Sequence, residues 1–313
     1  MLTPYSYPCH SLSSRFIIIL YKRLLHTFTL QSTKTFSWGN HLKIMGACGL
    51  KTATYRYYDR STNGLNFEGM VEDIQKAPKG SIILLHACAH NPTGCDPTKE
   101  QWNQIYQAIL EKEHVAFFDS AYQGFASGDS EKDAWALREA VAQGLPVMLA
   151  QSFAKNFGLY GERCGTLSIV CGDEKQKELV MSQLKCIIRP MYSSPPRHGS
   201  SIVKTVLSNE KLTAQYYDEC ASMADRILDM RTKLVAKLKE VGSKHDWSHV
   251  TDQIGMFAFT GMSAEMCDRL TNEYSIYLTK DGRISIAGLN DSNLDYVAKA
   301  IHDVTDGKSI TSN

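Results

Sequence analysis

Residues 81–87 read SIILLHA, an apolar run with the length of a strand. Three similar runs follow it: AFFDSA at 116–121, VMLAQSF at 147–153 and GTLSIVC at 165–171. Continuous apolar character, without alternation, is typical of strands buried on both faces of a sheet. Helical sequence separates the runs at 100–111 and 134–142. We therefore predict an α/β fold, a three-layer, mostly parallel sheet with helices on both faces.

The sequence after the sheet predicts a different pattern of elements. Residues 211–241 read as one long amphipathic helix that ends at Gly242. Shorter elements are expected beyond it: strands at 256–260 and 283–288 and a helix at 264–273. This pattern predicts a smaller α+β domain at the C-terminus. We expect the large domain to span 37–222 and the small domain 223–313, with 1–36 unassigned.

Composition excludes several classes of protein. The 313 residues include 34 Lys and Arg and 33 Asp and Glu, so the formal net charge of +1 gives no bulk attraction to nucleic acid or anionic membranes. No apolar run approaches the roughly 20 residues that span a bilayer. The nine cysteines contain no C-x-x-C pair, so we expect no metal site and a reducing compartment. The expected partners are small molecules or proteins.

The first 58 residues contain no Asp or Glu but seven Lys and Arg residues among many Ser and Thr. This composition is typical of a transit peptide. The alternative is a basic N-terminal strand or helix. Both interpretations stay open for residues 1–36.

Polar side chains stand where the predicted strands end, and ligands of open α/β sheets bind at the carboxyl ends of strands. Asp119 ends the second run, and Ser152 and Lys155 end the third. Alone, Asp119 could cap a turn and Lys155 could be a solvated loop charge. Together with Tyr122 and Arg163 they form the set that pyridoxal phosphate chemistry needs: an amine for a Schiff base, an anion for the ring nitrogen and a cation for the phosphate.

The chain also resembles aspartate aminotransferase, a fold-type I pyridoxal-phosphate enzyme, and most closely the mitochondrial branch. The resemblance runs from about residue 37 to 304. Its motifs are WGNH at 38–41, YRYYD at 55–59, HACAHNPTG at 86–94, DSAYQGFASG at 119–128, SFAKNFGLYGER at 152–163 and KDGRIS at 280–285. The resemblance implies a large domain of the PLP-transferase type, transamination between L-aspartate and 2-oxoglutarate, a homodimer and a location in the mitochondrial matrix, with the cytoplasm as the alternative.

The resemblance also implies roles for the cofactor site. Lys155 would form the Schiff base and carry the catalytic proton, and Asp119 would pair with the pyridinium nitrogen. Trp38 would stack on the ring, and Asn91 and Tyr122 would bond its phenolic oxygen. The phosphate would be held by Ser152 and Arg163.

Two arginines would bind the substrate. Arg283 would hold the α-carboxylate, near Asn91 and Trp38. Arg189 would cross the dimer interface and bind the distal carboxylate in the partner's site, which selects dicarboxylic substrates.

One family feature has no match in this sequence. The family carries a Ser-Gly-Thr turn upstream of the Trp38 position that binds the phosphate through backbone N–H groups, and residues 1–36 show none. We therefore expect weaker cofactor binding and an unpaired sheet edge. The alternative function is a truncated, non-catalytic family remnant that binds ligand or pairs with a full-length subunit.

Overall fold

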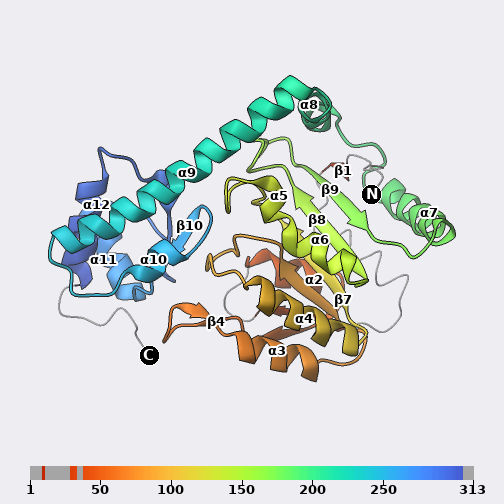
Figure 1. The fold of residues 1–313 in the computed structure, drawn as a ribbon, viewed down its shortest axis with the longest axis horizontal. Helices are drawn as coiled ribbons and strands as arrows, with labels where there is room; N and C mark the ends of the chain where they lie inside the picture. Colours follow the sequence, from red (N-terminus) through yellow and green to blue (C-terminus); the bar gives the residue numbers. More distant parts are fainter. Residues whose placement is uncertain (1–8, 11–28, 34–37, 306–313) are drawn as a thin grey trace.

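The computed structural model describes residues 9–10, 29–33 and 38–305 (Figure 1). Its main sheet has seven strands in the order β1-β9-β8-β7-β6-β2-β3. These strands are β1 (Cys9–His10), β2 (Thr29–Thr33), β3 (Lys51–Tyr55), β6 (Ile82–His86), β7 (Val115–Ser120), β8 (Val147–Ser152) and β9 (Cys164–Ile169). The strands from β3 across to β8 run parallel, and β9 lies antiparallel to both β8 and β1. The predicted mostly parallel sheet is confirmed.

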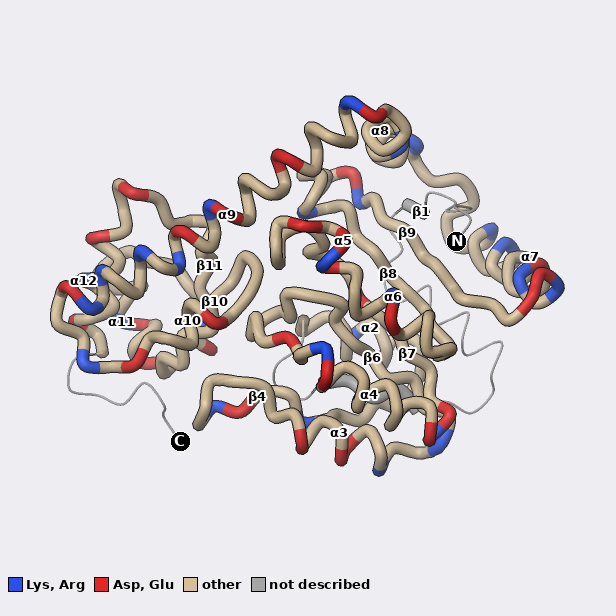
Figure 2. Tube along the Cα trace, in the orientation of Figure 1, with Lys and Arg blue, Asp and Glu red and all other residues tan. Residues whose placement is uncertain are grey.

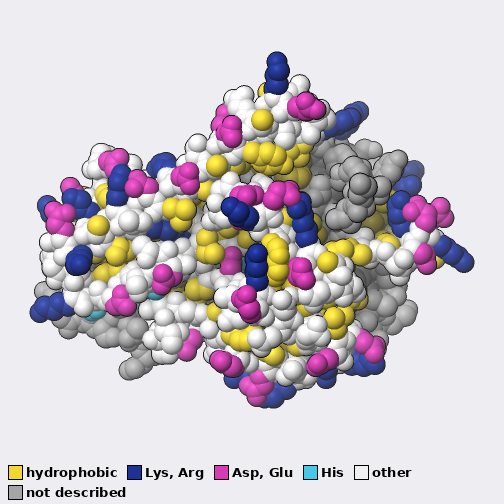
Figure 3. All heavy atoms as spheres, viewed as in Figure 1, with side chains coloured by type: hydrophobic (Ala, Val, Ile, Leu, Met, Phe, Trp, Pro, Cys, Tyr) yellow, Lys and Arg dark blue, Asp and Glu magenta, His cyan; other side chains and the backbone are white. Residues whose placement is uncertain are grey.

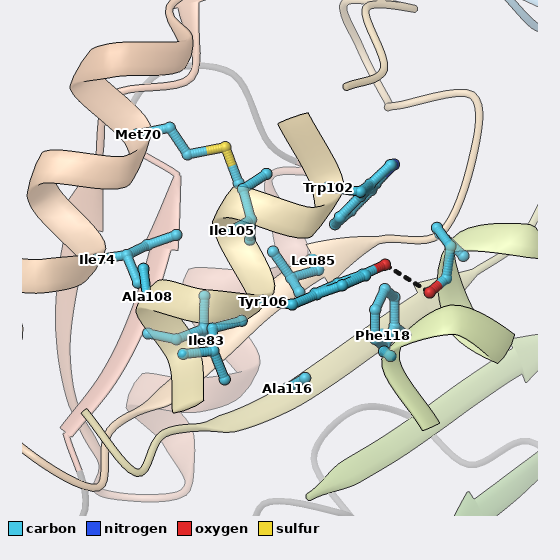
Figure 4. Close-up of a cluster of buried hydrophobic side chains, with 14 of the residues drawn as sticks. Met70, Ile74, Ile83, Leu85, Trp102, Ile105, Tyr106, Ala108, Ala116 and Phe118 are labelled. Carbon is cyan, nitrogen blue, oxygen red and sulfur yellow. Dashed lines mark hydrogen bonds between the residues drawn. The ribbon is translucent and has the colours of Figure 1, made fainter. Parts of the chain in front are cut away.

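Three helices cover one face of this sheet: α3 (Phe67–Lys76), α4 (Lys99–Glu111) and α6 (Trp135–Ala142). Figure 4 shows Ile83, Leu85 and Phe118 of the sheet packed around Ile105 and Tyr106 of α4. These side chains are fully buried, and each contributes about 1.5–3 kcal/mol of hydrophobic stabilisation. A capping box, in which Thr98 and Gln101 bond each other's backbone N–H groups, fixes the start of α4.

The opposite face is covered by α2 (Asn40–Ala47) and α7 (Glu174–Met191). Here the alternate strand residues Ile82, Leu84 and Phe117 pack against these helices. Successive residues of one strand therefore enter different cores. This explains why the strands are apolar at every position.

The chain after the sheet builds a second core. Its elements are α8 (His198–Leu207), α9 (Glu210–Glu240), α10 (Ser248–Asp252), β10 (Phe257–Phe259), α11 (Ala264–Tyr274), β11 (Arg283–Ser285), the 3-10 turn η1 (Ile286–Gly288) and α12 (Leu294–Thr305). The C-terminal half of α9 packs against α12, α11 and the antiparallel strand pair β10–β11 in one hydrophobic cluster. Figure 1 shows α9 leading from α8, beside the sheet, to this second core.

Smaller elements complete the described chain. They are the hairpin of β4 (Tyr58–Asp59) and β5 (Gly64–Leu65) and the short helix α5 (Ser130–Asp133). Charged side chains of both signs are mixed over the surface (Figures 2 and 3). Within residues 9–10, 29–33 and 38–305, no helix is long and apolar enough to cross a bilayer.

The N-terminal strands bear on two expectations. Strands β1 and β2 join the sheet, whereas the remainder of the expected presequence, at 1–8, 11–28 and 34–36, lies outside the described residues. The sheet edge expected to be unpaired is paired in part, because β1 bonds only to Cys164 and Gly165 of β9. Among the described residues, the rest of β9 has no neighbour on that side.

Candidate active site

The carboxyl ends of β6, β7 and β8 lie level with one another. His86 pairs with Asp119, and Ser120 pairs with Gln151, so the polar strand ends meet at one edge of the sheet. A pocket of about 290 Å³ opens there. Seven predicted site residues line it: Trp38, Asn91, Asp119, Tyr122, Ser152, Lys155 and Arg163.

Asp119 has a histidine partner that the sequence does not predict. His41, buried on α2, donates from Nε2 to Asp119 Oδ2 at 2.9 Å. Burial alone would raise the pKa of Asp119, but the hydrogen bond from His41 and the nearby charge of Lys155 more than offset it. The pKa therefore lies below its ordinary value, and Asp119 is a fixed anion in the pocket.

Two further histidines lie behind this pair. The His86 ring lies 5.5 Å from that of His41 and 4.3 Å from that of His90, which stacks on Tyr57 at 3.9 Å. Burial lowers the pKa of His86 well below its usual value and that of His90 to about 3. Both rings are therefore neutral at physiological pH.

Lys155 follows β8 and places its ammonium 5.2 Å from the centre of the Tyr122 ring. Within the described part of the chain no carboxylate lies within ion-pair distance of it. Burial lowers the pKa of Lys155, the charge of Arg163 lowers it further, and Asp119 opposes both. The amine is therefore more readily deprotonated, and more nucleophilic at neutral pH, than an ordinary lysine.

These causes predict how Lys155 titrates. An amine-modifying reagent, mapped by peptide over a pH series, should label Lys155 at lower pH in the folded protein than in the urea-unfolded chain. Arg163→Met should raise the pKa of Lys155, because it removes a like charge, and Asp119→Asn should lower it, because it removes an opposite charge. A pKa that is the same in folded and unfolded protein would contradict this account.

Two consecutive hydrogen bonds connect the pocket to the second core. Arg283 donates to Asn91 Oδ1 at 2.9 Å, and Asn91 Nδ2 donates to the Tyr122 hydroxyl at 3.3 Å. The Arg283 guanidinium also lies 4.8 Å from the centre of the Phe257 ring. Burial raises the pKa of Tyr122 to about 12, so its phenol is protonated and can donate.

Ser152, Arg163 and Trp38 stand at the rim. Ser152 Oγ accepts from the Ala154 amide at 3.2 Å and keeps its own proton available. Arg163 has a left-handed backbone, with φ 52°, and donates to Tyr160 O at 3.1 Å. Trp38 is 41% exposed and meets His41 edge-on at 5.2 Å, which leaves much of its surface open.

Two predicted site residues do not line the pocket: Arg283, which reaches it through its hydrogen bond to Asn91, and Arg189, which stands apart from the others. Arg189 lies exposed near the end of α7. Among the described residues, no carboxylate pairs with it. It is therefore available to a second molecule, and its assigned role stays a prediction.

Sequence reasoning missed two supporting carboxylates. Half-buried Asp96 accepts the amides of Ala89 and His90 at 2.6 and 2.9 Å, and so holds the turn that carries Asn91. Asp133 accepts the amides of Gly124, Ala126 and Ser127 and so holds the turn after Tyr122. Asp96 stands in the sequence two residues after the quoted motif at 86–94. The bond to the backbone was not readable from it.

Comparison with known proteins identifies the class. Residues 32–301 match the family of class I and II aminotransferases, and the chain belongs to this family. It is 55% identical over 269 residues to the mitochondrial aspartate aminotransferase of Gallus gallus and 56% identical to that of Dictyostelium discoideum. These alignments cover 86% of this chain but only 64% and 63% of the relatives, so the chain spans less than two thirds of their length.

Solved structures agree with the fold. A mitochondrial aspartate aminotransferase from Trypanosoma brucei superposes with a TM-score of 0.91 at 43% identity, over 96% of this chain and 80% of that one. An aromatic-amino-acid aminotransferase from Burkholderia pseudomallei, described as covalently bound to pyridoxal phosphate, has a TM-score of 0.90 at 41% identity and covers 93% and 72%. The resemblance and fold class predicted from the sequence are confirmed.

Proposed function

We propose that this protein catalyses pyridoxal-phosphate-dependent transamination between L-aspartate and 2-oxoglutarate, giving oxaloacetate and L-glutamate. One observation carries the proposal: a lysine with a lowered pKa and a histidine-paired anionic aspartate line the same pocket. The first would hold the cofactor covalently and the second would face its ring nitrogen. Membership of the aminotransferase family supports the same reaction.

The donor set of the pocket fits the cofactor. The ring nitrogen of the cofactor needs a carboxylate, and its aldehyde needs a free amine. Its phenolic oxygen needs a hydrogen-bond donor, and its phosphate needs hydroxyl groups and cations. Asp119, Lys155, Tyr122 and the pair Ser152 and Arg163 supply these in turn, all from the lining of one pocket. Gly165, also in the lining, lets β9 approach β8 closely beside Ser152, since a Cβ there would lie 2.5 Å from Gln151 O.

When bound, pyridoxal phosphate supplies an electron sink for the bonds of the substrate α-carbon. The side chains of this chain do the rest. Lys155, once its amine is free, takes the α-proton and returns it as a general base and acid. His41 keeps Asp119 anionic and oriented, and Tyr122 and Asn91 direct donors into the pocket. Trp38 would cover the ring from the rim.

Substrate recognition is assigned to two arginines. Arg283, held by Asn91 and by the Phe257 ring, would bind the α-carboxylate as a two-donor fork. Arg189 of the partner subunit would bind the distal carboxylate and so select C4 and C5 dicarboxylic acids. Its exposure outside its own chain's pocket supports an action in the partner's site of a homodimer.

Subunit mixing tests the role of Arg189. Arg189→Ala alone should reduce turnover of aspartate far more than that of alanine, because alanine has no distal carboxylate to lose. Arg189→Ala and Lys155→Ala dimers, unfolded together and refolded, should recover activity, because each hybrid dimer contains one complete site. If Arg189 acted in its own chain, no hybrid site would be complete, and the mixture would stay as inactive as its components.

Two wider assignments belong to this proposal. The relatives named as mitochondrial support a mitochondrial location, in the matrix. The division into a large domain at 37–222 and a small domain at 223–313 is supported by the two separate cores. Each would contribute to one site, through Lys155 and through Arg283.

The direct test is an assay of oxaloacetate formation from aspartate and 2-oxoglutarate by purified protein with added cofactor. We expect turnover that depends on both substrates. Binding of aspartate without any oxaloacetate would favour the non-catalytic alternative.

A further inference from the structure

The α9 helix carries a buried arginine that the mechanism above does not use. Arg231 is 1% exposed, and among the described residues no carboxylate pairs with it. Its guanidinium instead donates to three backbone carbonyls: Val250 O at 2.6 Å, Gly255 O at 2.8 Å and Phe257 O at 2.5 Å. Burial lowers its pKa to about 10, so it stays charged at neutral pH. A buried charge met only by carbonyls is costly to keep, and an apolar side chain would fill the same space.

The three carbonyls belong to one segment, residues 250–257, which turns back on itself before β10. Gln253 closes the turn: its amide donates to Phe259 O at 3.0 Å and accepts from the Phe259 N–H at 2.7 Å. Gly255 adopts a left-handed backbone with φ 91°. The turn thus directs several carbonyls inward, where they need donors. Arg231 supplies them from a neighbouring helix.

This segment lies directly against the turn that carries Asn91. The Ile254 amide donates to Gly94 O at 2.8 Å. A Cβ added at Gly94 would lie 2.8 Å from Ile254 O, and one added at Gly255 would lie 2.7 Å from the Cβ of Ala89. The two turns meet backbone to backbone, with glycines where they touch. Ile254, Met256 and Phe257 also pack against the cluster that contains Tyr122.

The segment ends at the floor of the predicted carboxylate site. The Phe257 ring lies 4.8 Å below the Arg283 guanidinium and meets Tyr122 edge-on at 6.4 Å. Phe257 also pairs with Ser285 across β10 and β11, two residues from Arg283. A shift of Phe257 would therefore move the support of Arg283 and its bond to Asn91 together.

From these contacts we infer that Arg231 is a positioning residue for substrate binding: by holding Val250, Gly255 and Phe257, it fixes the turn at residues 253–257 against the turn at 89–94 and so sets the position of Arg283 relative to Asn91. The substrate part of this inference rests on the proposed function. The coupling of the two turns does not.

The first experiment measures that coupling without activity. Hydrogen exchange of the backbone amides is compared in the wild-type protein, Arg231→Met and Leu270→Ala. Leu270 is fully buried in the same core, on α11, and none of the hydrogen bonds that hold residues 250–257 involves it, so its truncation destabilises the second core while leaving those bonds in place. We expect Arg231→Met to speed exchange at least about tenfold both in 253–257, whose carbonyls Arg231 binds, and in 89–94, to which the described structure shows no hydrogen bond from Arg231, with β7 unchanged. Leu270→Ala should leave 89–94 as in the wild type. Unchanged exchange at 89–94 in Arg231→Met overturns the coupling.

The second experiment measures substrate binding. Succinate, a four-carbon dicarboxylate, is titrated calorimetrically into cofactor-loaded protein, and kcat and KM for aspartate are measured. A misplacement of about 1 Å can cost on the order of 10²-fold, so we expect at least about a tenfold loss of succinate affinity and a similar rise in KM in Arg231→Met. Cofactor stoichiometry should not change. Arg231→Lys keeps the charge but not the planar fork, so its succinate affinity should lie between those of the wild type and Arg231→Met. Arg231→Met affinity equal to that of the wild type, or an equal loss in Leu270→Ala, overturns the role.

Two further measurements distinguish failure of this inference from misfolding of a variant and from failure of the proposed function. If Arg231→Met does not fold, Gly255→Ala and Arg231→Lys test the same contact, and wild-type affinity in both overturns the inference. If the wild-type protein neither binds succinate nor transaminates aspartate, the proposed function fails. The exchange experiment then decides the coupling by itself.

Discussion

Lys155→Ala should reduce the rate of transamination by at least about 10²–10⁴-fold, the usual contribution of a positioned general acid or base. The expected loss is this large because the same amine would also hold the cofactor covalently, and the pocket offers no second lysine among its lining residues. The measurement is kcat for aspartate with excess 2-oxoglutarate and saturating cofactor. Aspartate binding should survive, since Arg283 and Asn91 are unchanged.

The control for this variant is Lys132→Ala. Lys132 lies exposed on α5, and its ion-pair partner in the described structure is nearby Asp129 at 3.4 Å. Its loss removes the same charge from the same region of the chain without touching the pocket. Wild-type turnover in Lys155→Ala would remove that residue from the mechanism.

Asp119→Asn has the second largest expected effect. The substitution keeps an oxygen that can accept from His41 but removes the negative charge that would face the ring nitrogen. Losing one partner of a buried charge pair costs about 3–5 kcal/mol, or roughly 10² to 4 × 10³-fold in kcat/KM. Cofactor affinity, measured by titration of the apoprotein, should fall in parallel.

Two related variants separate charge from hydrogen bonding at this position. Asp119→Glu keeps the charge at a displaced position and should retain more activity than Asp119→Asn. His41→Gln keeps the carboxylate of Asp119 and replaces only the group that donates to it. The loss of activity in His41→Gln should therefore be smaller than that in Asp119→Glu. The account is contradicted if His41→Gln proves more damaging than Asp119→Asn.

The sheet could be predicted because its strands are buried on both faces. The runs at 81–87, 116–121 and 147–153 correspond to β6, β7 and β8 within about one residue. Helix α7 was not predicted, and its pattern explains this: over eighteen residues only Leu184 and Ile187 are buried, and Pro190 stands in its last turn. With so few apolar contacts, the helical period is weak in the sequence.

The part of the site that lies at the carboxyl ends of the strands could be predicted from the sequence. Asp119, Ser152 and Lys155 follow apolar runs, and parallel strands bring such ends together. The partner of Asp119 could not be found in this way, because His41 lies 78 residues earlier and reaches it only when α2 packs on the sheet. Arg231 was equally hidden. It sits within an amphipathic helix, and its partners are backbone carbonyls with no mark in the sequence.

The central claim is that Lys155 holds pyridoxal phosphate in the pocket at the ends of β6, β7 and β8. The most direct test is borohydride reduction of the purified protein after incubation with the cofactor, followed by proteolysis and mass mapping. We predict one phosphopyridoxyl group per chain, on the peptide that contains Lys155, and its loss in Lys155→Ala without transfer to another lysine. A label on any other lysine, a label spread over surface lysines, or no label at saturating cofactor would contradict the claim.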